Sequence, residues 1–192
     1  MANRAFVAYL LPALFPLVGG CDRVSGGVSD QGNAIEVVVS DPASRPLAGA
    51  QVRIRPSDWV RGSAVAADRM RDGRTDSLGR FRCERLPQGD YILEAVDDSL
   101  VGALALAAPQ GVATLAVGTD RGASIVLYGL ASDWNVALRG LDRASEPLED
   151  GSVRFSNLPS IPISVRIATP DSTRLLALSA PVPGTTGAYN AQ

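Results

Sequence analysis

The chain has 192 residues, and its 18 basic and 20 acidic side chains leave a net charge of −2, a balance that gives no argument for a nucleic-acid partner. It contains no histidine, which excludes Ser-His-Asp and Cys-His catalysis within this chain. Its basic residues are all arginine, so the lack of lysine also excludes Schiff-base chemistry and P-loop phosphate binding.

The first 20 residues are typical of an export signal. Arg4 precedes an apolar run over residues 5–18, which is too short to span a bilayer. The run ends in Val-Gly-Gly-Cys at 18–21, and small residues before a cysteine resemble a bacterial lipobox. This resemblance implies cleavage before Cys21 and a lipid on its thiol. The protein would then be anchored in a bacterial cell envelope, at the outer membrane or the periplasmic face of the inner membrane. The alternative is an ordinary signal peptide with an incidental cysteine.

Residues 21–33 are expected to form a flexible tether, because they are polar and rich in glycine and serine. The first folded module is expected over 34–119. Within it, apolar and polar residues alternate at 35–40 and again at 51–55. This period of two predicts two half-buried strands, and the prolines and glycine between them predict a turn.

The rest of the first module keeps the same period. After a long arginine-rich connection at 57–77, we expect a strand that carries Phe81 and Cys83, then strands near 91–95, 101–107 and 112–118. Short strands separated by recurring turn signals favour an all-β sandwich. Cys83 is expected to face inward as a free thiol, and a disulfide to Cys21 is the alternative.

A nine-residue segment recurs 72 residues further along the chain. Gly-Arg-Phe-Arg-Cys-Glu-Arg-Leu-Pro at 79–87 matches Gly-Ser-Val-Arg-Phe-Ser-Asn-Leu-Pro at 151–159, with the glycine, one arginine and Leu-Pro in register. The repeat predicts a second β-sandwich module over 120–179. Its expected strands lie at 124–128, 136–138, 163–167 and 174–178. The last residues, 180–192, are expected to form a frayed tail.

Several short motifs occur in a characteristic order in the first module. They are Pro46-Leu47-Ala48-Gly49-Ala50, Thr75-Asp76, Gly79-Arg80-Phe81, Leu86-Pro87 and Gly89-Asp90-Tyr91. This ordered set, over about 35–97, resembles the carboxypeptidase regulatory-like domains. The resemblance implies a transthyretin-like sandwich, so the expected fold is all-β, with two tandem Ig-like or transthyretin-like modules. The second module matches only over 151–178, as a degenerate copy or another Ig-like sandwich.

The sequence offers only weak candidates for catalysis or metal binding. The carboxylate pairs Asp97-Asp98 and Glu149-Asp150 lie at predicted turns, where aspartate favours the backbone geometry. A glycosidase would instead hold two carboxylates across its substrate. The aspartates at 68, 72 and 76 do not have the spacing of an EF-hand. We therefore expect no catalytic residue, no metal and no cofactor.

Six residues are candidates for ligand binding. They are Trp59, Arg61, Arg69, Arg71 and Arg74 in the arginine-rich connection, and Trp134, where Ser-Asp-Trp recurs. A tryptophan can stack on a sugar ring or accept an arginine on its face. The alternative, which we favour, is that both tryptophans plug the ends of the sandwich cores.

These features together predict a non-catalytic envelope lipoprotein. It would contact the membrane through its N-terminal lipid and act as an interaction or scaffold module for a protein partner. The alternative function is carbohydrate binding, in which Trp59, Trp134 and the loop arginines would hold a polysaccharide. A small hydrolase is disfavoured by the lack of histidine.

Overall fold

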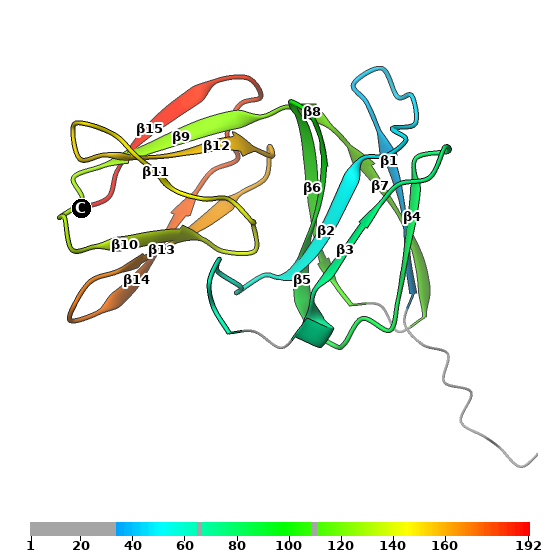
Figure 1. Cartoon of the computed structure of the whole chain (residues 1–192), viewed down its shortest axis with the longest axis horizontal. Coiled ribbons are helices and arrows are strands. Elements are labelled where there is room, and N and C mark those ends of the chain that lie inside the picture. The colour runs from blue at the N-terminus through cyan, green and yellow to red at the C-terminus, as the bar shows by residue number, and fades with distance from the viewer. Residues whose placement is uncertain (1–33, 65–66, 109–110) are drawn as a thin grey trace, which may run out of the picture. The chain divides into compact units, whose positions relative to one another are not determined.

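A computed structural model of the chain describes residues 34–64, 67–108 and 111–192. These residues form an all-β structure (Figure 1). The first elements are β1 (Ala34–Ser40), β2 (Gln51–Pro56), the 3-10 helix η1 (Ala67–Arg69), β3 (Arg71–Arg74), β4 (Arg80–Glu84), β5 (Asp90–Asp97), β6 (Leu100–Ala107) and β7 (Val112–Gly118). The remaining elements are β8 (Asp120–Arg121), β9 (Ala123–Tyr128), β10 (Asn135–Leu138), β11 (Glu146–Pro147), β12 (Val153–Leu158), β13 (Ile163–Ala168), β14 (Thr173–Leu178) and β15 (Thr186–Asn190).

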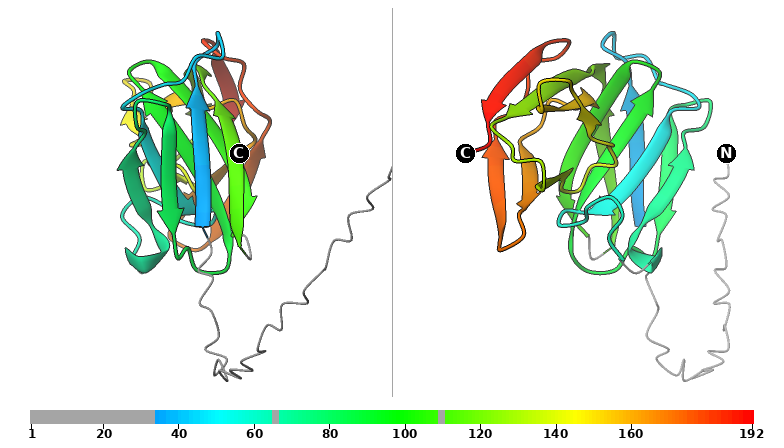
Figure 2. Two further views of the ribbon diagram at one scale, coloured as in Figure 1. Left: turned by 90° about the vertical axis from the view of Figure 1, so that its right-hand side faces the viewer. Right: turned by 60° about the vertical axis from the view of Figure 1, so that its left-hand side comes forward.

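The first sandwich consists of a sheet in the order β4-β1-β7 and a sheet in the order β3-β2-β5-β6-β8. Figure 2 shows β1, in blue, among the strands of this sandwich. Alternate residues of the strands point inward and form one hydrophobic core, as the period of two predicts. Its buried members include Ile35, Val37, Val52, Tyr91 and Leu93.

The second sandwich consists of a sheet in the order β11-β12-β9-β15 and a sheet in the order β10-β13-β14. Its core is a separate hydrophobic cluster, which includes Ile125, Leu127, Phe155, Val165 and Ile167. The two clusters draw on different stretches of the chain, so the all-β, two-sandwich fold expected from the sequence is confirmed.

The two sandwiches repeat one topology. In both, the first strand pairs with the last strand in parallel, as β1 with β7 and β9 with β15, and also pairs antiparallel with a third strand, β4 or β12. The opposite sheets contain the equivalent runs β2-β5-β6 and β10-β13-β14. The sequence repeat is therefore accompanied by a repeat of these strand pairings. The third strand of each sandwich in chain order differs, because β3 pairs with β2 whereas β11 pairs with β12.

The repeated segment also repeats its backbone hydrogen bonds. Gly79 N–H donates to the Asp76 carbonyl at 3.0 Å, and Gly151 N–H donates to the Leu148 carbonyl at 3.0 Å. Both glycines have positive φ, 70° and 79°, a conformation that glycine adopts without steric cost. Gly79 closes the turn that leads into β4, and Gly151 closes the turn that leads into β12. The same kind of turn therefore precedes the equivalent strand in both sandwiches.

Hydrogen bonds join several of the motifs that carry the family resemblance. The Thr75 hydroxyl accepts the Ala50 N–H at 2.9 Å and donates to the Leu47 carbonyl at 2.5 Å. The Asp76 carboxylate accepts the N–H groups of Leu78 and Arg80, each at 2.8 Å. Two turns that are distant in sequence are thereby held against each other at one end of the first sandwich.

Cys83 is buried on β4 as a free thiol, as the alternation predicts. Burial raises the pKa of this thiol, although the charge of Arg71 opposes the shift. The equivalent residue of the second sandwich is Phe155, which is also buried. Cys83 therefore fills a core position.

Two expectations about irregular segments were wrong. The predicted frayed tail contains β15, whose residues pair with β9 from Thr186 to Asn190. The arginine-rich connection contains η1 and β3, and β3 pairs antiparallel with β2. In both cases, hydrogen bonds to a neighbouring strand order a segment whose own sequence has no clear alternation of apolar residues.

The predicted signal peptide, Cys21 and the tether lie outside the described residues. Within the described part of the chain, no helix is long and apolar enough to cross a membrane.

Candidate functional site

The predicted candidate Trp59 lies in the interior. It follows β2, its side chain is 7% exposed, and the guanidinium carbon of Arg55 lies 5.5 Å from its ring centroid. Its carbonyl accepts the Gly140 N–H of the second sandwich at 2.7 Å. In this arrangement the indole offers little surface to a ligand, but Trp59 belongs to neither hydrophobic core cluster.

Three of the predicted arginines hold nearby parts of the first sandwich. Arg71 donates to the carbonyls of Met70 and Arg85, each at 2.9 Å, and Arg74 donates to the Gly49 carbonyl at 2.7 Å. The guanidinium carbon of Arg69 lies 5.7 Å from the ring centroid of Tyr91. These contacts hold β3 and the neighbouring turns in place.

Trp134 lies elsewhere and has a different surrounding. It precedes β10, whereas Trp59 follows β2, the strand equivalent to β10. The two tryptophans therefore occupy opposite ends of equivalent strands, so the recurrence of Ser-Asp-Trp does not place them at equivalent positions. The recurrence of Ser-Asp-Trp reflects two turns of similar composition.

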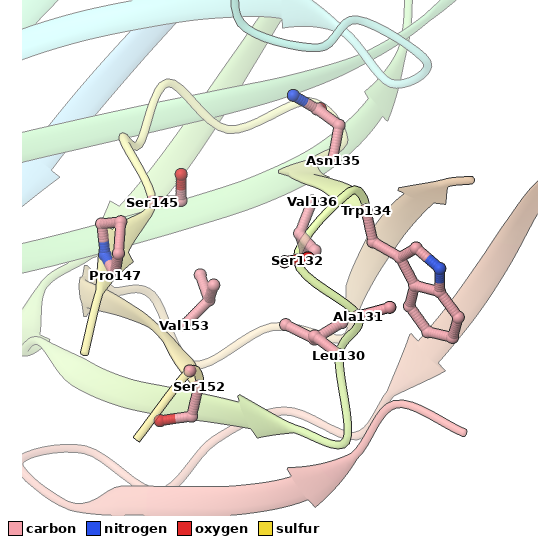
Figure 3. A pocket seen from close by; sticks show the side chains of 11 residues that line it. Leu130, Ala131, Ser132, Trp134, Asn135, Val136, Ser145, Pro147, Ser152 and Val153 are labelled. Carbon is pink, nitrogen blue, oxygen red and sulfur yellow. The ribbon is translucent and has the colours of Figure 1, made fainter. Parts of the chain in front are cut away.

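A cavity of about 290 Å³ lies beside Trp134 in the second sandwich. Figure 3 shows Leu130, Val136 and Val153 pointing into the space between two segments of the chain, while the indole of Trp134 points away from it. Ser145 and Pro147 line the opposite side. The cavity thus has a mixed lining of apolar side chains and polar groups such as Ser132, Asn135 and Ser152.

The indole of Trp134 borders a second, larger hollow of about 520 Å³. The guanidinium carbon of Arg174 lies 5.2 Å from the ring centroid, a distance typical of a cation–π contact. Asp133 and Asp171 add carboxylates to the same lining. An aromatic ring beside carboxylates and a guanidinium can stack on and hydrogen-bond a polyhydroxylated ligand.

Arg61 is the one predicted arginine whose surroundings connect with this region. It is exposed, its guanidinium lies 3.5 Å from a carboxylate oxygen of Asp142, and it lines a cavity of about 210 Å³. That cavity shares Asn135 and Ser145 with the cavity beside Trp134. The structure therefore brings Arg61 and Trp134 to neighbouring hollows and leaves the other four candidates apart from them.

A buried ion pair, which the sequence analysis missed, joins the two sandwiches. Glu94 on β5 is 2% exposed, and one of its carboxylate oxygens lies 2.5 Å from a guanidinium nitrogen of Arg143. Arg143 also donates to the Asn157 carbonyl at 2.9 Å. Burial raises the pKa of the Glu94 carboxyl, and Arg143 opposes the shift. The sequence does not indicate that Glu94 is buried, because Glu94 occupies an ordinary outward position in the alternating pattern of its strand.

Further contacts surround this ion pair. A carboxylate oxygen of Asp142 lies 3.9 Å from Arg53 and 4.0 Å from Arg55. An isolated bridge pairs Val60 with Arg139. Ile92 of β5 packs against the core of the second sandwich. The junction therefore combines ion pairs, a backbone bridge and an apolar contact.

The carboxylate pairs considered for catalysis serve as turn residues. The Asp150 carboxylate accepts the Ser152 hydroxyl at 2.6 Å and the Ser152 N–H at 3.0 Å, and these hydrogen bonds lower its pKa. Asp98 has a φ of 48° in the turn between β5 and β6. Among the described residues, no group of three or more Cys, Asp or Glu side chains could hold a metal ion.

No protein-family model matches this sequence, and no curated protein matches it. The resemblance to carboxypeptidase regulatory-like domains therefore stays a prediction.

Several solved structures share a distant likeness with the chain. The Bacillus anthracis TIE protein is 12% identical, over 84% of this chain and 33% of that chain, with a TM-score of 0.34. A streptococcal ancillary pilin is 13% identical, over 85% of this chain and 63% of that one, with a TM-score of 0.36. The major pilin SpaD from Corynebacterium diphtheriae is 10% identical, over 76% of this chain and 65% of that one, with a TM-score of 0.36.

This chain spans less than two thirds of the length of each of these three proteins. Their TM-scores lie below 0.5, so they carry no argument about its activity or partners.

Proposed function

We propose that this chain is a non-catalytic lipoprotein of a bacterial cell envelope that acts as an interaction scaffold. The observation that carries the proposal is the junction of the two sandwiches through the buried pair of Glu94 and Arg143. A duplicated sandwich whose copies are joined by buried contacts presents surfaces at a fixed separation. Such an arrangement suits a protein that holds partners.

The proposed anchor comes from the sequence. A signal peptide over 1–20 would be removed, Cys21 would carry the lipid, and residues 21–33 would tether the first sandwich to the membrane. The first sandwich would extend through β8, beyond the expected boundary at 119, and the second would run from β9 through β15. Stable anchoring requires more than one acyl chain, so both the thiol and the new N-terminus of Cys21 would be acylated.

Intact-mass spectrometry of the protein extracted from its native membrane tests the anchor. The expected mass is that of a chain beginning at Cys21 plus diacylglycerol and a further acyl chain. The Cys21→Ser variant is the control and should lose both modifications. An exported wild-type chain with an unmodified Cys21 would overturn the anchoring.

Cross-linking in intact cells tests the scaffold. The wild-type protein is expected to form a discrete cross-linked adduct with another protein. A Glu94→Arg variant, whose like charges would repel across the junction, should lose or alter that adduct while remaining in the membrane. Recovery of only the free chain over a range of cross-linker lengths would contradict the scaffold.

Carbohydrate binding is the second candidate function, and the hollow beside Trp134 favours it. A polysaccharide that binds there would change the fluorescence of Trp134. The Trp134→Ala variant should lose the response, whereas Trp59→Phe, a change at a buried position, should keep it. If no member of a broad polysaccharide panel changes the wild-type spectrum, this function is excluded for that panel.

A further inference from the structure

The free edges of the sheets differ in charge from one strand to another. On the edge strands β3 and β4 of the first sandwich, three of four and three of five residues are charged. In the second sandwich, β15 has no charged residue and β14 has one, Arg174. Charged side chains on an edge strand discourage pairing with another chain. The edges at β14 and β15 lack this protection, as do the edge strands β7 and β10, which carry no charged residue.

The edge strand β14 is regular as well as uncharged along most of its length. It pairs with β13 over six consecutive residues without a register shift, and it contains no proline. Its outward residues Thr173, Leu175 and Ala177 are exposed, with Leu175 57% exposed. Figure 2 shows β14 and β15, in orange and red, at the rim of the second sandwich. Within the described residues, no strand pairs with the other side of β14.

The single charge of β14 is already engaged. Arg174 is exposed, but it lies on the same side of the strand as Leu176 and Leu178, opposite Ile167 in the register. Its guanidinium lies over the ring of Trp134. The guanidinium of Arg174 is therefore directed toward Trp134, and the outward side of β14 carries only uncharged side chains.

We propose that β14 pairs antiparallel with β14 of a second copy of this chain. An antiparallel pairing centred on Leu176 would put Leu175 opposite Ala177 and Arg174 opposite Leu178. No charge then faces a like charge, so the strand is complementary to itself. Its unpaired N–H and C=O groups would complete a sheet that is continuous across two molecules.

A pairing of two six-residue strands buries little surface, so the dimer belongs to the weak, concentration-dependent class. A charged or proline-containing strand from another protein would fit this uncharged edge less well. The inference rests on the geometry of the edge and goes beyond the proposed function, since it requires neither the lipid nor the junction between the sandwiches.

Charge complementation tests the proposal directly. The full chain is purified in detergent, and its association is measured by sedimentation velocity over a range of concentrations. Two double variants are compared, Leu175→Glu with Ala177→Glu and Leu175→Lys with Ala177→Lys. In the proposed register, each double variant sets like charges opposite each other in its own dimer. The control is Val182→Glu, which changes an exposed apolar residue, 64% exposed, outside any strand.

The wild type and the Val182→Glu control are expected to dimerise reversibly. Each double variant alone should have its dissociation constant raised by about a hundredfold, and an equimolar mixture of the two should dimerise again. A wild type that stays monomeric at every concentration would overturn the proposal, whether or not the variants fold. Folded double variants that dimerise like the wild type, or a mixture that stays monomeric, would overturn it as well.

Discussion

At the scale of single residues, Glu94 and Arg143 form a buried ion pair whose two members depend on each other. Both side chains are largely withdrawn from water, at 2% and 11% exposure. Removal of one partner leaves the other charge buried without compensation, which is strongly destabilising. By contrast, the pair of Arg82 and Glu84 lies at the surface, at 54% and 62% exposure, where water screens the attraction.

We predict that Arg143→Met lowers the free energy of unfolding by about 3 kcal/mol at neutral pH. The variant should regain stability as the pH falls through the raised pKa of Glu94 toward its ordinary value of 4.5, because a neutral carboxyl needs no counter-ion. Denaturant unfolding at several pH values measures this.

The wild type should show the same sign of pH dependence, but more weakly. Because burial raises the pKa of Glu94 in the folded state, this group contributes most stability below pH 4.5 and loses that contribution as the pH rises. The surface control Arg82→Met should cost less than about 1 kcal/mol. A deficit of Arg143→Met that stays constant between neutral pH and pH 4.5 would contradict the assignment.

Cys83 gives a second prediction at this scale. Since the thiol is buried and burial raises its pKa, little of the reactive thiolate is present or accessible. A maleimide should leave Cys83 unlabelled in the native protein and label it fully in denaturant, as peptide mass spectrometry would show. Rapid native labelling at Cys83 would mean that β4 opens or that the thiol is exposed.

At the scale of elements, the repeated turn provides a matched pair of glycines. Gly79 and Gly151 have similar positive φ, but their surroundings differ. A Cβ atom added at Gly79 would lie 2.6 Å from the Val39 carbonyl oxygen, whereas one added at Gly151 would have no atom within 4 Å. The first turn is therefore packed against the backbone of β1, and the second is open.

We predict that Gly151→Ala costs about 1 kcal/mol of unfolding free energy, the strain of a left-handed alanine. Gly79→Ala should cost at least about 1 kcal/mol more, because the backbone must also shift to relieve the contact. Thermal and denaturant unfolding of the two variants measures the difference. Equal costs would show that the two turns are not packed as the structure has them.

The same scale explains which elements could be predicted from the sequence. Strands such as β1, β5 and β13 can be predicted from the sequence, because inward apolar residues alternate with outward residues over several positions. The sequences of β3, Arg-Asp-Gly-Arg, and β15, Thr-Gly-Ala-Tyr-Asn, contain no such alternation. They form strands because β3 pairs with β2 and β15 pairs with β9. The local sequence of a segment carries no information about such a pairing with a distant strand.

The candidate site was predicted in part for a similar reason. Aromatic and basic residues are visible in a sequence, so the sequence alone indicates Trp134 and Arg61 as candidates. Burial is a property of the assembled sheets, so the interior position of Trp59 was one of two alternatives. Arg174 was missed because its partner Trp134 lies 40 residues earlier in the chain and meets it only in the fold.

At the scale of the whole molecule, we predict that the two sandwiches fold and act together. Each sandwich alone is small, and small domains bury a smaller share of their surface. The junction adds the ion pair of Glu94 and Arg143, the bridge between Val60 and Arg139 and the packing of Ile92. An interaction scaffold requires this coupling, since independent sandwiches would not hold two surfaces at a fixed separation.

The two tryptophans allow a direct measurement, because Trp59 belongs to the first sandwich and Trp134 to the second. In the variants Trp134→Phe and Trp59→Phe, the remaining tryptophan reports the unfolding of one sandwich by fluorescence. We predict that the two denaturant transitions have the same midpoint and slope, and that they separate when Arg143→Met is added. Transitions that already differ in the single-tryptophan proteins with Arg143 intact would contradict a coupled pair of sandwiches.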